Sequence, residues 1–152
     1  VTHNDTKLNN VLMDAKTGDG VCIIDLDTVM PGSVLYDFGD SIRFGASSAP
    51  EDEKDLSKVY IDLGMFEAYV KGFVGQLHDS MTPDEIMSLP MGAYLMTLET
   101  GIRFLGDYLN GDVYFHTHYE GQNKDRARNQ LKLIADMDEK LPAMQEIVKK
   151  YL

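Results

Sequence analysis

The sequence predicts an α+β fold that is mostly α-helical and carries one small β-hairpin near its N-terminus. Two short apolar runs, residues 11–13 and 21–24, flank a turn rich in glycine and aspartate, which is the pattern of a hairpin. Beyond residue 60, apolar residues recur at intervals of three and four, which is typical of amphipathic helices. With 152 residues, of which 43% are hydrophobic, the chain can form one domain with a buried core.

Turn residues define the N-terminal elements. The hairpin is expected over residues 11–25, with its turn at Gly18-Asp19-Gly20. A loop with a turn at Pro31-Gly32 follows, and a helix is expected from Asp37 to Phe44, with Asp37 as its N-cap by residue type. Residues 45–55 are polar and acidic, a composition that favours a mobile surface loop.

Helical periodicity covers most of the C-terminal part. Helices are expected over residues 63–78 and 91–109, and Thr82, Pro83 and Glu85 have the spacing of a capping box that starts a short helix between them. In the helix over 91–109, the apolar residues at intervals of three and four are expected to face the core: Tyr94, Leu95, Leu98, Ile102, Leu105 and Leu109.

Two more helices are expected near the C-terminus, over residues 122–138 and 142–152, because Pro142 interrupts the helical pattern. The first of them carries basic side chains that are expected to form a solvated face: Lys124, Arg126, Arg128 and Lys132. His116 and His118 have no third metal ligand nearby in the sequence, so we expect no metal role for them.

The overall composition narrows the classes of partner. The chain has 14 Lys and Arg against 25 Asp and Glu, a formal net charge of -11, which disfavours nucleic acid and anionic membranes. No apolar stretch approaches the about 20 residues that span a bilayer, and no signal peptide is recognisable. The single cysteine, Cys22, is expected in the core and can form no internal disulfide, which fits a reducing compartment. We therefore expect a cytoplasmic protein.

A group of polar residues precedes the hairpin. His3, Asp5 and Asn10 have the spacing of a kinase catalytic loop, in which Asp follows His by two residues and Asn follows Asp by five. Lys7 stands where a catalytic-loop lysine can reach the transferred phosphate. Asp25 ends the second apolar run, so the hairpin returns it to the same end of the ribbon as the first loop.

Each of these residues also has a purely structural interpretation. Asp5 could be an N-cap or Asx-turn residue, Asn10 a turn residue, and Asp25 the end of a strand. Phosphoryl transfer needs a carboxylate at the acceptor hydroxyl and oxygen ligands for Mg2+, and little covalent chemistry from the protein. The three residues in this order, joined by a hairpin, therefore favour a kinase-type site.

Longer motifs extend the similarity. The residues His3 to Asn10, Ile24 to Asp27, Pro31-Gly32 and Tyr36 to Asp40 resemble the aminoglycoside/choline kinase-like phosphotransferase superfamily. Within it, the strings His-Asn-Asp-Thr-Lys-Leu-Asn-Asn and Ile-Asp-Leu-Asp-Thr-Val-Met-Pro-Gly are similar to the N-acetylhexosamine 1-kinases. The aminoglycoside branch usually has Gly after the His and an aromatic residue after the metal-binding Asp, where this chain has Asn and Leu.

The resemblance implies a role for each residue of the candidate site. Asp5 would orient the acceptor hydroxyl or accept its proton, and Lys7 would stabilise charge on the transferred phosphoryl group. Asn10 and Asp25 would hold Mg2+. The implied cofactors are ATP and Mg2+.

Other positions are implied to support the site or to contact the sugar. His3, Asp27 and Asp37 would help to hold the loop or the metal region, although Asp27 could only solvate a loop end and Asp37 could be a plain cap. Arg103 and Tyr114 match the family's acceptor-binding wall and would contact the sugar. From the residues alone, Arg103 could form a surface ion pair with the glutamate four residues earlier, and Tyr114 could pack in the core.

The resemblance implies that residues 1–152 form the C-terminal lobe of a protein-kinase-like fold, with the catalytic hairpin, the metal site and the acceptor-binding helices. No pattern of strand, glycine-rich loop and strand that would cover the phosphates occurs in the sequence. We therefore expect the N-terminal nucleotide lobe of the same polypeptide to be absent from this chain, and the isolated chain to be inactive. The expected partners are a nucleotide and a small-molecule sugar.

The expected function is phosphorylation of the anomeric hydroxyl of an N-acetylhexosamine (GlcNAc or GalNAc) to the 1-phosphate. A kinase of the same fold with another acceptor, such as an aminoglycoside, a choline-like amino alcohol or another sugar, stays open, because the acidic residues 51–55 could serve a cationic acceptor. A non-catalytic binding module that keeps the scaffold is an alternative from another class.

Overall fold

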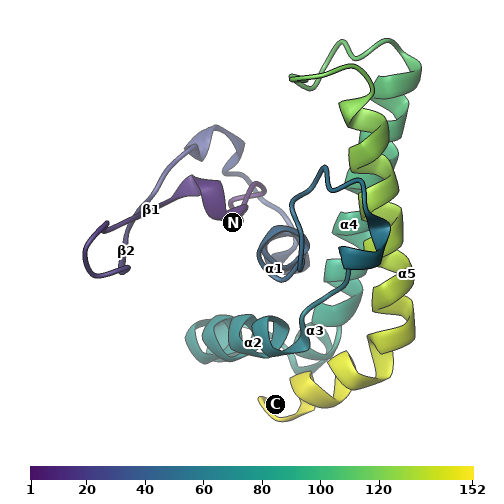
Figure 1. Cartoon of the computed structure of the whole chain (residues 1–152). Coiled ribbons are helices and arrows are strands. Elements are labelled where there is room, and N and C mark those ends of the chain that lie inside the picture. The colour runs from purple at the N-terminus through teal and green to yellow at the C-terminus, as the bar shows by residue number, and fades with distance from the viewer.

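The computed structural model describes all residues from 1 to 152. Figure 1 shows α4 and α5 side by side. α1 lies on one side of this pair, between the pair and a hairpin that projects away from the helices. This arrangement confirms the expected α+β, mostly helical fold. The elements are β1 (Val11–Met13), β2 (Gly20–Ile23), α1 (Val34–Gly45), α2 (Leu63–Leu77), α3 (Pro83–Met87), α4 (Leu89–Leu109) and α5 (Gln122–Lys149). Short 3-10 turns lie at Leu8–Asn10, Leu26–Thr28, Leu56–Lys58 and His78–Ser80.

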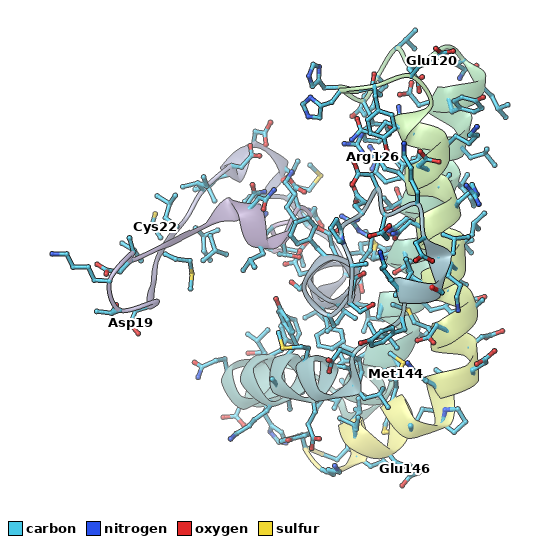
Figure 2. All side chains as sticks on the ribbon, in the orientation of Figure 1. Asp19, Cys22, Glu120, Arg126, Met144 and Glu146 are labelled. Carbon is cyan, nitrogen blue, oxygen red and sulfur yellow. The ribbon has the colours of Figure 1, made fainter.

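The hairpin forms where the sequence predicts it. β1 and β2 are antiparallel, with Val11 opposite Ile23, and the left-handed conformation of Gly18 (φ 77°) lets the turn close. All residues of β2 are exposed, because nothing in residues 1–152 packs over this ribbon. The expectation that Cys22 lies in the core is therefore wrong, and Figure 2 shows Cys22 on the projecting hairpin.

The helix after the hairpin begins earlier than expected. α1 starts at Val34, and the hydroxyl of Ser33 accepts the backbone N–H of Leu35 as the N-cap. Asp37 therefore lies in the first turn of α1 and is not its cap, so its carboxylate is free to bind another segment. The next residue points into the core: the buried ring of Phe38 packs edge-on against Phe66, with 5.9 Å between ring centroids.

The buried face of α4 differs from the one that apolar periodicity predicts. Leu95, Ile102, Leu105 and Leu109 are exposed. The packed face consists mainly of small residues, and these are Gly92, Ala93, Thr97, Thr100 and Gly101. A Cβ on Gly92 would lie 2.7 Å from the carbonyl oxygen of Leu35 in α1, and a Cβ on Gly101 would lie 3.1 Å from Gln130 in α5. Small residues allow three helices to approach closely here, and this contact decides which face of α4 is buried.

The two helices expected at the C-terminus are one. α5 runs from Gln122 to Lys149 with Pro142 inside it, so the predicted break is wrong. Proline removes one backbone hydrogen bond, but Met137 and Met144 are fully packed on either side of it, and this burial keeps the helix continuous. Figure 1 shows the last turns of α5 bending beneath α2, as expected of a proline inside a long helix.

The main core lies where α1, α2, α3, α5 and the first turns of α4 meet. The capping box predicted at Thr82 and Glu85 is present at the start of α3. None of the helices combines the length and the apolar character that crossing a bilayer requires.

Candidate active site

The polar loop of residues 3–10 is fastened to α1 by one carboxylate. Asp37 accepts the backbone N–H of His3 at 2.9 Å and that of Asn4 at 2.7 Å. The hydroxyl of Thr6 donates to the carbonyl oxygen of Asp37, which adds a third bond between the loop and the helix. Asn4 has a left-handed backbone (φ 65°), a conformation that Asn tolerates better than most residues. Asp37 thus sets the direction in which the chain enters Asp5.

Asp5 is the centre of a small polar group. Its carboxylate accepts a hydrogen bond from the ammonium of Lys7 at 2.8 Å and another from the side-chain amide of Asn10 at 2.9 Å. Partial burial raises the pKa of Asp5, but the hydrogen bonds from Lys7 and Asn10 and the charge of Lys7 more than offset this, so the pKa lies below its ordinary value. Asp5 is therefore a charged hydrogen-bond acceptor at neutral pH.

The end of the hairpin is tied to the same loop. The backbone N–H of Ile24 donates to the carbonyl oxygen of Asn10 at 2.9 Å, and the imidazole Nε2 of His3 lies 3.1 Å from the carbonyl oxygen of Ile24. Asp25 follows at once, in a left-handed backbone conformation (φ 64°) that costs an aspartate roughly 1–3 kcal/mol. The side chains of Asp25 and Asp27 are exposed. Local strain thus accompanies the placement of Asp25 beside the loop of residues 3–10.

A cavity of about 490 Å³ opens between this loop and the helices α1, α4 and α5. Four of the candidate site residues named from the sequence line it, namely Asp5, Lys7, Arg103 and Tyr114. His3, Asn10, Asp25, Asp27 and Asp37 are not among its lining residues. The structure therefore brings the implied base and the implied sugar contacts to one cavity. The implied metal ligands are outside its lining: Asn10 donates to Asp5, and Asp25 follows Ile24, whose N–H donates to Asn10.

Arg103 and Tyr114 form one wall of the cavity. The guanidinium carbon of Arg103 lies 5.7 Å from the ring centre of Tyr114 and 5.4 Å from that of Phe115. Arg103 also pairs with Glu99 at 3.8 Å, so the surface ion pair considered from the sequence exists alongside its place in the cavity. Tyr114 is 72% exposed, which excludes the alternative that it packs in the core.

A further part of the wall contains charged residues that were not among the candidate site residues of the sequence. Arg43 in α1 is buried and pairs with Asp40 at 2.9 Å and with Glu51, and Arg126 in α5 lies 3.6 Å from Glu51. Burial lowers the pKa of the Arg43 guanidinium, but the charges of Asp40 and Glu51 outweigh it and hold the pKa above its usual range. All four side chains line the cavity.

This network corrects two expectations. The segment 45–55 is not a free loop, because Glu51 is held by Arg43, Asp52 accepts from Gln122 at 2.8 Å, and the carbonyl oxygen of Pro50 accepts from Asn129 at 2.9 Å. Arg126 does not belong to a solvated face, since its side chain is only 16% exposed, and Figure 2 shows it in the upper part of α5. The sequence signals for this wall were Asp40 and Arg43 at helical spacing, three residues apart, and the acidic segment 51–55 that contains Glu51.

Two histidines lie together near the cavity, and no third His, Cys, Asp or Glu joins them. The rings of His116 and His118 stack edge-on, with 4.8 Å between centroids, and no group of three or more His, Cys, Asp and Glu side chains is arranged to bind a metal ion. Any bound divalent cation would therefore need amide oxygens or ligand atoms in addition to carboxylates.

The comparison with protein families agrees with the part of the chain that carries the loop and the hairpin. Residues 1–69 match the model of the phosphotransferase enzyme family. The matched segment contains the loop of residues 3–10, the hairpin, α1 and the start of α2, whereas α4 and α5 lie beyond it. The match supports the similarity to aminoglycoside/choline kinase-like phosphotransferases and suggests a phosphotransferase, without indicating the acceptor.

Proposed function

We propose that this chain is the C-terminal, acceptor-binding lobe of an ATP-dependent kinase that phosphorylates the anomeric hydroxyl of an N-acetylhexosamine. The observation that carries this proposal is the cavity in which the charged Asp5 meets Lys7, Arg103 and Tyr114. The similarity of residues 1–69 to phosphotransferases supports the reaction class.

The proposed roles follow from the contacts of the loop. Asp5 accepts the hydrogen bond of the acceptor hydroxyl and orients its oxygen toward the phosphate, since its lowered pKa keeps it ionised. Lys7, whose ammonium lies 2.8 Å from Asp5, contributes positive charge at the point where negative charge develops on the transferred group. Arg103 and Tyr114 offer hydrogen-bond donors and a ring face to the sugar.

Two residues, one in the loop of residues 3–10 and one at the end of the hairpin, suit Mg2+. The amide nitrogen of Asn10 is occupied by the backbone oxygen and the carboxylate of Asp5, so its carbonyl oxygen is left as an acceptor. Asp25 adds an exposed carboxylate at the end of the hairpin. Oxygen atoms of this kind are the ligands that Mg2+ takes from proteins, the remainder being water and phosphate. When bound, Mg2+ would neutralise charge on the nucleotide phosphates.

The charges of the cavity favour an uncharged acceptor. Its lining has four cationic side chains, Lys7, Arg43, Arg103 and Arg126, and three carboxylates. Each of these carboxylates already has a cationic partner, because Asp5 pairs with Lys7, Asp40 with Arg43, and Glu51 with Arg43 and Arg126. No carboxylate of the cavity is left for an ammonium group, which argues against an aminoglycoside or a choline-like acceptor.

The proposal assigns ATP to an N-terminal lobe of the same polypeptide that residues 1–152 do not include. A non-catalytic scaffold is the alternative, and nucleotide titration of the full-length polypeptide with and without Mg2+ separates the two. A kinase binds the nucleotide more tightly with Mg2+, whereas a scaffold shows no Mg2+-dependent binding.

A panel of acceptors tests the function. The full-length polypeptide, ATP and Mg2+ are incubated with N-acetylglucosamine, N-acetylgalactosamine, glucose, an aminoglycoside or choline, and ADP release is measured. We expect turnover with the N-acetylhexosamines and little with the cationic acceptors. Turnover with the cationic acceptors alone would overturn the assignment of the acceptor, and no turnover with any of them, together with no Mg2+-dependent nucleotide binding, would overturn the assignment as a kinase.

A further inference from the structure

The C-terminal end of α4 contains a buried carboxylate that belongs to none of the roles described above. Asp107 is 6% exposed and forms no ion pair; instead, its two oxygens accept four N–H groups. One oxygen accepts the backbone N–H of Val113 at 3.0 Å and that of Tyr114 at 2.9 Å. The other accepts the backbone N–H of Phe115 and the side-chain amide of Asn123, both at 2.9 Å.

The chain reverses direction around this carboxylate. Gly111 (φ 93°) and Asp112 (φ 56°) both have left-handed backbones, and the N–H of Asp112 donates to the carbonyl oxygen of Asp107 at 2.9 Å. Asn123, fully buried in the first turn of α5, donates to Asp112 as well, at 2.8 Å. The segment 113–115 is thus fixed to α4 and to α5 through one side chain.

This segment carries part of the cavity wall. Tyr114 and Phe115 line the cavity, and Phe115 packs on Phe104 with 4.7 Å between ring centroids. The side chain of Tyr114 is largely exposed, so burial contributes little to holding it in place. Its position therefore depends on its backbone, which Asp107 holds.

The protonation state of Asp107 fits this arrangement. Burial raises its pKa, but the N–H groups of Phe115, Tyr114 and Val113 outweigh burial and lower it below the ordinary value. The N–H groups compensate the charge of the carboxylate. A neutral amide of the same shape could not accept hydrogen bonds from all of them, because its NH2 group would face N–H donors.

We propose that Asp107 is a positioning residue for the acceptor, which fixes Tyr114 and Phe115 on the cavity wall through their backbone N–H groups. The proposal rests on the proposed function, because it concerns the same cavity. It separates two tasks in one site: Asp5 acts on the reacting hydroxyl, and Asp107 shapes the surface that binds the rest of the acceptor.

The test uses Asp107→Asn in the full-length polypeptide, with the exposed Asp79→Asn as the matched control. We expect the KM for the N-acetylhexosamine to rise roughly tenfold to a hundredfold, because displacing a binding group by about 1 Å costs up to that much. The KM for ATP and kcat should change little. In a Tyr114→Ala background, Asp107→Asn should raise the acceptor KM much less, because both changes remove the same contact.

A second measurement does not depend on the acceptor. Amide hydrogen exchange at Val113, Tyr114 and Phe115 should be faster in Asp107→Asn than in Asp79→Asn. If Asp107→Asn fails to fold, Asn123→Ala removes one of the four donors, and with it the oxygen that accepts from Arg126. This variant should give a smaller rise in the acceptor KM together with faster exchange at residues 113–115. An unchanged acceptor KM in the variant that folds, or unchanged exchange, would overturn the proposal. If the wild type shows no turnover but exchange is faster in Asp107→Asn, the proposed function is overturned. In that case Asp107 still anchors residues 113–115.

Discussion

The side-chain amide of Asn10 donates a 2.9 Å hydrogen bond to the carboxylate of Asp5. The residue proposed to act on the acceptor and the residue proposed to hold the metal are therefore one hydrogen-bonded unit. Because the amide nitrogen of Asn10 donates to Asp5, a substitution at either position removes a hydrogen bond from the other residue. Substitutions at these two positions must therefore keep the shape of the side chain.

The first prediction concerns Asp5→Asn. The amide keeps the shape of the side chain but cannot accept the hydroxyl proton, so turnover of the full-length polypeptide should fall by about 10²–10⁴. Nucleotide affinity, measured by calorimetric titration, should be nearly unchanged. Asp79→Asn, on an exposed side chain, should behave as the wild type, and wild-type turnover by Asp5→Asn would remove this residue from the mechanism.

The second prediction concerns Asp25→Ala. Removing this carboxylate should abolish the Mg2+-dependent part of nucleotide binding, because few other oxygen ligands are available beside Asn10. The measurement is nucleotide titration at several Mg2+ concentrations, with Asp19→Ala at the tip of the hairpin as the control. Mg2+-dependent binding that persists in Asp25→Ala would show that this side chain is not a ligand.

The third prediction concerns the wall of Arg103 and Tyr114. Arg103→Lys keeps the charge but loses the planar fork of donors, and Tyr114→Phe keeps the ring but loses the hydroxyl. Each should raise the acceptor KM by about tenfold, equivalent to one or two hydrogen bonds, and leave the KM for ATP unchanged. Arg128→Lys, an exposed residue of α5, is the control. Equal effects on both KM values would contradict a specific contact with the acceptor.

The fourth prediction concerns stability. Arg43→Met removes the buried cation between Asp40 and Glu51 and should lower the free energy of unfolding by about 3–5 kcal/mol, because both carboxylates lose their main partner. Urea denaturation measures this difference. Arg128→Met, whose side chain is about half exposed, should change the same quantity by no more than about 0.5 kcal/mol. Similar values for the two variants would mean that the network contributes little.

The fifth prediction concerns pH. The folded-state pKa values of Asp5 and Asp107 lie below the ordinary 3.8, so the stability that they contribute is fully present above pH 3.8. It is lost as the pH falls through the lower folded-state values. The thermal midpoint should therefore be steady from about pH 7 to pH 5 and fall steeply below about pH 4. A midpoint that is constant down to pH 2.5 would contradict these shifts.

The sequence predicted those parts of the fold that local signals determine. The hairpin turn, the capping box at Thr82 and the helical stretches have short-range causes, and so does the spacing of Asp5 and Asn10 within one loop. The predicted start of α1 was wrong, because Ser33 is also a good cap residue by type. In the structure Ser33 caps the helix, and Asp37 instead binds the N–H groups of His3 and Asn4.

The remaining parts depend on contacts between distant segments. The small residues of α4 are buried because α1 and α5 pack closely against them. The spacing of apolar residues along α4 does not indicate this close packing. Arg126 joins the cavity wall through Glu51, which lies 75 positions earlier in the sequence. The anchoring of residues 113–115 by Asp107 needs the reversal at Gly111, and a charged residue in an amphipathic helix gives no sign of it.

Phosphorus NMR of a reaction mixture tests the central claim most directly. The full-length polypeptide is incubated with ATP, Mg2+ and N-acetylglucosamine, and the product signals are compared with those of the Asp5→Asn variant. We expect the wild type to produce a sugar 1-phosphate and ADP, and the variant to produce at most about a hundredth as much of either in the same time. A spectrum that shows only ATP, or equal product from both proteins, would contradict the claim that Asp5 and its cavity transfer phosphate to a sugar hydroxyl.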